Sequence, residues 1–233
     1  MTKTQLLENL GFKITNDVTN LIDNYQKEFL TYNSHTNLIS KNDEKVLFEK
    51  HIYDSLAINI FSPIKNCKKL MDIGTGGGFP SVPIAMLYSQ MEVFGVDSID
   101  KKIKFINQIA KTLSLKNLTA QTTRTEDLDA KYKENFDIIT SRAVAPLNVI
   151  LEYAAPYLKT NGYFVAYKSK IVNDEIEQAQ NALNVLNCKL EDVINYELPL
   201  EENYDRNLVI IKKIKKTPAE YPRRVGLAKS NPL

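Results

Sequence analysis

The spacing of hydrophobic positions changes near residue 70, and this change divides the chain into two parts. Up to about residue 60, apolar side chains recur every three or four positions, as in Val18, Leu21, Ile22, Tyr25 and Phe29. Such spacing places them on one face of an α-helix. The pattern therefore predicts a helical N-terminal region, residues 1–62, that packs on the remainder of the chain, residues 63–233.

From residue 70 onward, short apolar runs alternate with amphipathic stretches. The runs are residues 70–73, 92–97, 118–121, 136–140 and 162–167, and the helical stretches are 81–88, 101–113, 147–158 and 172–186. This alternation is typical of strand-helix-strand units and a parallel sheet. Two further runs, 189–197 and 207–214, have only a polar loop between them. We therefore expect an α/β fold with five parallel strands and an antiparallel pair at the sheet edge.

Four of the eight glycines lie within residues 74–78, directly after the first predicted strand. Gly74, Gly76 and Gly78 would allow positive φ and a close approach of a ligand to the backbone. The helix that follows would present unpaired N–H groups to that ligand. Asp97 ends the second predicted strand, 23 residues after Gly74, near the ~20-residue offset of an acid that binds ribose hydroxyls. The segment indicates a site for a nucleoside-containing cofactor.

The loop differs from a dinucleotide-binding motif, because position 79, where a third glycine would stand, holds Phe79. Asp72, two residues before the loop, would be an awkward neighbour for a diphosphate, although it could also simply cap the turn. S-adenosylmethionine has a ribose for Asp97 and a cationic sulfonium and amino group that tolerate Asp72. The pattern therefore favours S-adenosylmethionine. A P-loop ATPase is excluded, because no Lys-Ser or Lys-Thr follows the glycines at the required distance.

Composition and charge indicate which partners and which compartment to expect. The formal net charge is +2, yet residues 212–229 contain seven Lys or Arg and one acid. Such a basic end either meets a polyanion or is a solvated tail. Two cysteines and two histidines without ligand spacing predict no metal site and a reducing compartment. No apolar stretch long enough for a membrane helix and no signal sequence is visible, so we expect a cytoplasmic protein without a membrane partner.

Several motifs resemble the family of ribosomal RNA small-subunit methyltransferase G, also called glucose-inhibited division protein B. The resemblance runs nearly end to end. It rests on residues 72–80, Asn37-Leu38-Ile39, residues 51–56, Arg124-Thr125-Glu126, residues 141–145, Lys168, and the terminal Tyr221-Pro222-Arg223 with Gly226, Pro232 and Leu233. One departure is Tyr32-Asn33, where members of the family often have Trp-Asn.

The resemblance implies a Rossmann-like class I S-adenosylmethionine methyltransferase with a seven-stranded, mostly parallel sheet. It implies methylation of guanine N7 at position 527 of 16S rRNA, either free or in the small ribosomal subunit or its assembly intermediate, and we expect a monomer. It also implies cofactor contacts at Gly74, Phe79, Thr125, Glu126 and Arg142. Arg124, Arg142 and Lys168 match the basic residues at the mouth of the family's active site and are the catalytic candidates.

The chemistry of guanine N7 agrees with the residues present. N7 has a lone pair and no proton, so its methylation requires no general base. Methylation of cytosine C5 would require a thiolate, usually after a proline, but Cys67 follows Asn66 and Cys188 follows Asn187. Arg142 would bind a phosphate or the cofactor carboxylate, unless it forms a surface salt bridge. Two other functions remain open: a methyltransferase for a protein or small molecule, and a non-enzymatic nucleotide-sensing or ribosome-assembly module.

Overall fold

A seven-stranded β-sheet forms the centre of the computed structural model, which describes residues 1–169, 172–200 and 204–233. The strands are β1 (Lys69–Ile73), β2 (Glu92–Asp97), β3 (Leu118–Thr122), β4 (Phe136–Arg142), β5 (Leu158–Lys168), β6 (Cys188–Leu198) and β7 (Tyr204–Lys213). They lie in the order β3-β2-β1-β4-β5-β7-β6. The first five are parallel, whereas β7 runs antiparallel to both β5 and β6. The predicted fold class is confirmed.

The strand order contains a switch point between β1 and β4. The chain proceeds outward from β1 to β3 on one side and from β4 to β5 on the other. Ile73 at the end of β1 is in register with Val96 of β2 and Ser141 of β4, so these three strands end side by side. Open α/β sheets bind their ligands at the carboxyl ends of the strands, where the order reverses. The topology therefore predicts a ligand-binding site among the loops after β1, β2 and β4.

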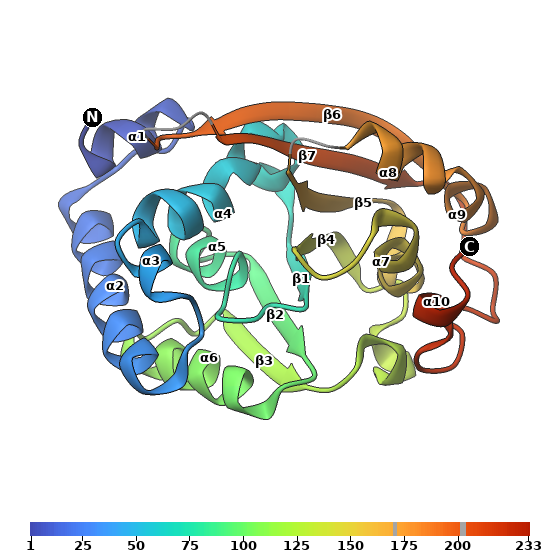
Figure 1. Cartoon of the computed structure of the whole chain (residues 1–233), viewed down its shortest axis with the longest axis horizontal. Coiled ribbons are helices and arrows are strands. Elements are labelled where there is room, and N and C mark those ends of the chain that lie inside the picture. The colour runs from blue at the N-terminus through green and yellow to red at the C-terminus, as the bar shows by residue number, and fades with distance from the viewer. Residues whose placement is uncertain (170–171, 201–203) are drawn as a thin grey trace.

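Helices cover both faces of the sheet (Figure 1). On one side lie α1 (Lys3–Asn9), α2 (Asn16–Thr36), α3 (Lys41–Glu44), α4 (Asp54–Leu56), α5 (Ser81–Leu87) and α6 (Asp100–Thr112). On the other side lie α7 (Leu147–Ala154), α8 (Asn173–Gln178), α9 (Gln180–Val185) and α10 (Leu227–Ser230). A π-helical turn covers Phe48–Tyr53, and 3₁₀ turns cover Ala57–Ile60, Ser62–Asn66, Thr125–Asp127, Ala130–Tyr132 and Ala155–Tyr157. Among the described helices, none has the length and apolarity that crossing a bilayer requires.

Two predicted helices on the second face differ from those observed. The stretch expected as one helix over residues 172–186 is two helices, because the backbone at Ala179 leaves helical geometry with φ −87° and ψ 0°. The helix expected over residues 147–158 ends at Ala154, and a 3₁₀ turn containing Pro156 follows. Proline lacks the N–H that an α-helix interior requires. Strand β5 consequently begins at Leu158, earlier than the predicted residue 162.

The N-terminal helices share their hydrophobic core with the sheet. One cluster of buried side chains includes Leu7 of α1, Phe29 of α2 and Val93 of β2. The ring of Phe29 lies 5.1 Å from that of Phe79 and 5.4 Å from that of Phe105 in α6, measured between centroids. Such aromatic contacts contribute beyond the area that they bury. The helical region is thus attached to the sheet over a continuous apolar surface.

A buried carboxylate also joins the N-terminal region to distant strands. Asp54 in α4 is fully buried, and its Oδ2 accepts hydrogen bonds of 2.8 Å from Nη1 of Arg142 in β4 and from Nη2 of Arg206 in β7. Its Oδ1 accepts from the Tyr196 hydroxyl of β6 at 2.6 Å and from Nε of Arg206 at 3.1 Å. Burial opposes ionisation of Asp54, but the hydrogen bonds and charges of the two arginines outweigh it and lower the pKa of this carboxyl group. From the sequence, Asp54 of the motif at residues 51–56 is expected only to cap a helix or turn. In the structure, it is instead the shared anion of two arginine side chains, Arg142 and Arg206.

We predict that Asp54→Asn strongly destabilises the fold, because it leaves two guanidinium groups without their shared anion. Removing one partner of a buried pair typically costs roughly 3–5 kcal/mol. The arginine side chains are 11% and 21% exposed, so we expect the lower end of that range in urea unfolding. Asp23→Asn is the matched control, since Asp23 pairs with Lys3 at the surface and should have little effect. Equal stability of the two variants would contradict the role of Asp54.

Candidate cofactor site

The loop after β1 turns sharply because its glycines adopt left-handed backbone angles. Gly74, Gly76 and Gly78 have φ of 68°, 57° and 89°. A Cβ atom at Gly74 would lie 2.3 Å from Cγ2 of Val144, and one at Gly78 would lie 2.5 Å from Cγ2 of Val82. Glycine is therefore required at these two positions by both the backbone conformation and the close packing.

Asp97 attaches this loop to the end of β2. Its Oδ2 accepts a hydrogen bond of 3.0 Å from the N–H of Gly76, and its Oδ1 accepts one of 2.9 Å from the N–H of Ile99. Nζ of Lys102 lies 3.7 Å from Oδ2. A carboxylate oxygen offers about two lone-pair positions. Each oxygen of Asp97 can therefore accept from a further donor, such as a ribose hydroxyl.

A cavity of about 350 Å³ opens at this edge of the sheet, beside the switch point between β1 and β4. Small-molecule sites usually have volumes of ~300–1,000 Å³. The wall is formed by the ends of β1 and β2, the segment after β3, the loop after β4, α7 and one residue of α10. Its position and size fit a nucleoside-sized ligand.

Five of the predicted site residues line this cavity together, namely Gly74, Asp97, Arg124, Thr125 and Glu126. They follow three different strands, and only the parallel sheet brings them to one edge. Ten further residues line the cavity, among them Val144, Tyr153 and Lys229. Val144 lies within the motif at residues 141–145, whereas Tyr153 lacks a local signal, because an aromatic residue near a loop is common. Lys229 was counted above only as part of a basic end.

Phe79 does not line the cavity but lies behind the glycine loop. It is 5% exposed, and its ring centroid lies 4.9 Å from that of His51 and 5.1 Å from that of Phe29. The guanidinium carbon of Arg142 lies 5.3 Å from the same ring, in a cation–π arrangement. In this structure, Phe79 supports the loop through the core, and the expected cofactor contact remains a prediction.

Arg142 is likewise separate from the cavity wall, because its guanidinium group points toward the N-terminal region. Besides the bond to Asp54, Nη1 donates to the carbonyl oxygen of Lys50 at 3.2 Å, and Nη2 lies 2.8 Å from Nδ1 of His51. Arginine has only donors, so Nδ1 of His51 must accept. Burial and the charge of Arg142 lower the pKa of His51 to about 4, which keeps the ring neutral with its proton on Nε2.

Lys168 at the end of β5 holds the loop after β4 from the opposite side. Its Nζ donates to the carbonyl oxygen of Ala145 at 3.0 Å and to Oε2 of Glu175 at 2.5 Å. The same Glu175 oxygen accepts from the N–H of Leu147, the first residue of α7. Arg142 and Lys168 thus fix both ends of the loop that presents Val144 to the cavity. Sequence reasoning missed Glu175, because the ion pair depends on how α8 packs.

Asp72 faces the interior and caps the turn, which was one of the two roles considered for it. It is fully buried, Oδ2 accepts from the N–H of Ser81 at 3.3 Å, and Oδ1 accepts from the Thr140 hydroxyl at 3.0 Å. Burial raises the pKa of Asp72 to about 6, despite the hydrogen bonds that favour the charged form. Asp72 therefore anchors α5 beneath the glycine loop and does not line the cavity.

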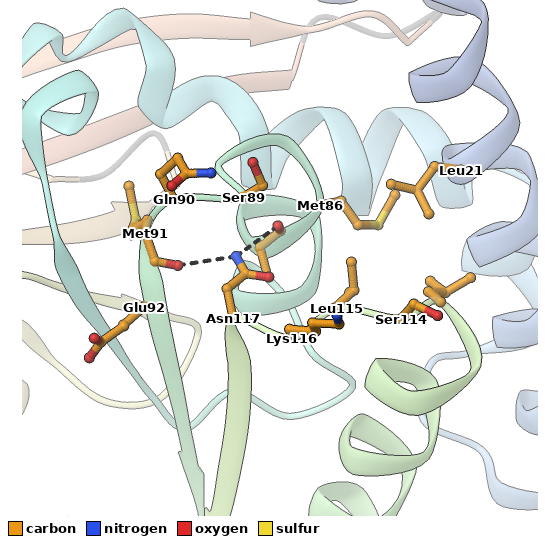
Figure 2. Close-up of a pocket in the computed structure, with 12 residues that line it drawn as sticks. Leu21, Met86, Ser89, Gln90, Met91, Glu92, Ser114, Leu115, Lys116 and Asn117 are labelled. Carbon is orange, nitrogen blue, oxygen red and sulfur yellow. Dashed lines mark hydrogen bonds between the residues drawn. The ribbon is translucent and has the colours of Figure 1, made fainter.

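A larger hollow, of about 590 Å³, lies at the opposite edge of the sheet (Figure 2). Figure 2 shows Asn117 pointing to the carbonyl oxygen of Met91, to which its Nδ2 donates at 3.1 Å. Glu92 begins β2 and Asn117 precedes β3, so this hollow is at the amino ends of the strands. Because parallel sheets bind ligands at their carboxyl ends, the smaller cavity is the candidate site.

Comparison with known proteins shows relatives of one family over most of the chain. A family model described as "rRNA small subunit methyltransferase G" matches residues 18–214. The chain is 39% identical over 228 residues to ribosomal RNA small subunit methyltransferase G of Clostridium kluyveri, covering 97% of this chain and 95% of the relative. It is 35% identical to the protein of the same name from Brevibacillus brevis over 238 residues, covering 100% of both.

Solved structures show the same fold at low sequence identity. M. jannaschii TYW2, crystallised in complex with AdoMet, superimposes with a TM-score of 0.53 and 14% identity over 66% of this chain and 76% of that one. The YcgJ protein of Bacillus subtilis has a TM-score of 0.53 and 16% identity over 68% of this chain and 98% of that one. These likenesses establish the α/β architecture and the strand arrangement around the cavity.

We predict that Asp72→Asn changes how stability depends on pH. The raised pKa means that between about pH 4 and pH 6 the folded state binds a proton that the unfolded state lacks. The stability of the unmodified protein therefore falls in that window, relative to the variant, as the pH rises. Urea unfolding from pH 4 to pH 7 should show the difference shifting in favour of Asp72→Asn. If the free energies of unfolding of the two proteins change with pH in parallel, the shifted pKa is contradicted. Asp100→Asn, at an exposed position, is the control.

Proposed function

We propose a function from one premise: the chain belongs to the family of rRNA small subunit methyltransferase G. It is an S-adenosylmethionine-dependent enzyme that methylates N7 of a guanine in 16S rRNA. The observation that supports this function best in the structure is the cavity that Gly74, Asp97 and Thr125 line at the switch point of the sheet. The roles of individual residues and the position of the guanine, 527, are our proposals.

The wall of the cavity fits the parts of S-adenosylmethionine. We propose that Asp97 accepts hydrogen bonds from the ribose hydroxyls, since both of its oxygens retain lone pairs beside the backbone donors that hold them. The segment at Thr125 and Glu126 would cover the adenine, and the backbone at Gly74 would face the methionine part. Gly76 and Gly78 would shape the loop, and Phe79 would support it from the core.

The reaction requires alignment more than proton transfer. When bound, the cofactor supplies an electrophilic methyl group on its sulfonium. Guanine N7 attacks with a lone pair and loses no proton, so the protein has to hold the base in line and exclude water. Arg124 is exposed at the cavity, and we propose that it pairs with the RNA near the target guanine. Arg142 and Lys168 would act through the loop after β4, whose two ends they hold.

The substrate would be 16S rRNA in the small subunit or its assembly intermediate, or free. We propose a cytoplasmic monomer with a helical region at residues 1–62 and a methyltransferase domain at residues 63–233.

Two free, buried cysteines, Cys67 and Cys188, agree with a reducing compartment. Burial raises the pKa of both thiols to about 12, so neither supplies the thiolate that methylation of cytosine C5 would require.

The first test of the function is a product analysis. Purified protein is incubated with methyl-labelled S-adenosylmethionine and either naked 16S rRNA or small subunits from cells that lack the activity. We expect 7-methylguanosine in the nucleoside digest. Mapping of the intact methylated rRNA should place the methyl group at position 527. The faster of the two reactions identifies the substrate. Label in protein or small molecules only would favour the alternative enzyme, and bound cofactor without any methylated product would favour a binding module.

The second test addresses Asp97. We predict that Asp97→Ala weakens S-adenosylmethionine binding by about 10- to 100-fold, because it removes charge-assisted hydrogen bonds and frees the loop at Gly76. Isothermal titration calorimetry measures the dissociation constant. Asp100→Ala is the matched control, three positions further along and exposed, and should bind normally. An unchanged constant for Asp97→Ala would remove Asp97 from the site.

A further inference from the structure

The C-terminal segment, residues 217–233, folds against the second face of the sheet. Tyr221 is 9% exposed within the hydrophobic cluster of that face. The Thr217 hydroxyl donates to the carbonyl oxygen of Ala155 at 3.0 Å, and Nζ of Lys133 donates to that of Tyr221 at 3.2 Å. Figure 1 shows α10, near the C-terminus, beside α7. This segment is thus part of the folded body.

A buried ion pair attaches the segment to α7. Glu152 of α7 is 1% exposed, and its Oε1 accepts from Nε of Arg223 at 2.9 Å while its Oε2 accepts from Nη2 at 2.5 Å. The backbone N–H of Arg223 also donates to Oε1, at 3.1 Å. Nη2 further donates to the carbonyl oxygen of Asn231 at 3.0 Å, which holds the last residues. Such two-pronged pairs of arginine with carboxylate are strong and directional.

Beyond this ion pair, the segment reaches the cavity. The N–H of Gly226 donates to Oε1 of Glu126 at 3.1 Å, and Gly226 has φ of 82°. Three residues later, Lys229 of α10 lines the same cavity as Asp97 and Glu126. The segment therefore contributes one lining side chain and one hydrogen bond to another lining side chain.

These contacts change the interpretation of the basic end. Lys213 is fully buried and donates to the carbonyl oxygens of Ala155 and Leu158 at 2.9 Å and 2.7 Å. Arg223 is occupied by Glu152. The basic residues of this end suggested a tail that binds a polyanion. Lys213 and Arg223 instead have partners within the protein, whereas Arg224 and Lys215 are exposed.

We propose that residues 217–233 form a clasp that completes the cofactor pocket. Arg223 and Gly226 are positioning residues: the first holds the clasp on α7, and the second fixes Glu126. Lys229 supplies part of the pocket wall and a donor for an acceptor atom of the cofactor. The clasp thus determines affinity for S-adenosylmethionine. The inference rests on the proposed function of the cavity, and it assigns the terminal motif to the cofactor instead of the RNA.

The experiment compares two neighbouring arginines in the full-length protein. Arg223→Ala should raise the dissociation constant for S-adenosylmethionine by about tenfold or more in calorimetry, equivalent to about 1.4 kcal/mol or more. Arg224→Ala removes the same kind of side chain from an exposed position and should change it less than about twofold. Arg223→Lys keeps one charged donor and should restore part of the affinity.

A second pair of variants leaves the buried ion pair intact. Lys229→Ala should also weaken cofactor binding, whereas Lys215→Ala, at an exposed position outside the cavity, should not. In steady-state assays, both Arg223→Ala and Lys229→Ala should raise KM for S-adenosylmethionine while leaving kcat and KM for the rRNA substrate unchanged. A merely structural role would lower the folded fraction without this selective change.

Three results would overturn the proposal. The first is normal cofactor affinity in folded Arg223→Ala, as judged by circular dichroism, or in Lys229→Ala, which decides the question if Arg223→Ala does not fold. The second is a raised KM for rRNA with unchanged cofactor affinity, which would assign the segment to RNA. The third is failure of the unmodified protein to bind S-adenosylmethionine. That result alone would refute the proposed function, so the two failures are distinguishable.

Discussion

The buried carboxylate of Asp54 is the interaction on which the arrangement of this molecule depends. Its side chain is fully buried, so its charge has to be balanced by groups of the protein. Arg142 and Arg206 provide that balance, and they come from β4 and β7. The N-terminal region, the switch-point strand and the antiparallel edge are thereby held at one point. Since Arg142 begins the loop that carries Val144, the same constraint fixes one wall of the cavity.

The cavity itself follows from parallel strands that end together. Asp97 can hold the loop after β1 only because β1 and β2 are neighbours in register. The hydrogen bond from Gly76 then orients the carboxylate before any ligand arrives. Preorganised groups of this kind lose little freedom on binding. The site therefore combines a backbone turn that leaves space with an acid that is already in place.

The periodicity of apolar residues was sufficient to predict the sheet and its antiparallel edge, and the four clustered glycines were sufficient to predict the loop, because each has a local pattern. It was insufficient where the structure depends on contacts between distant residues. The separation of α8 from α9 at Ala179 has no local proline or glycine. Asp54 and Glu175 gained their roles from arginine and lysine partners on other elements. A pattern of charges along the chain cannot show which charges become neighbours.

Chemistry explains why so many positioning residues accompany a simple reaction. An acceptor that loses no proton requires no acid or base, so the protein contributes by geometry and by excluding water. Residues that position the segments lining the cavity then matter as much as residues that contact the ligand. Arg142 and Lys168 hold the loop after β4, and Arg223 holds the C-terminal segment. Each is a cation bonded to a carboxylate of another element. These three basic side chains therefore hold the segments around the cavity, whereas Arg124 is exposed there and is the residue that we propose to bind the RNA.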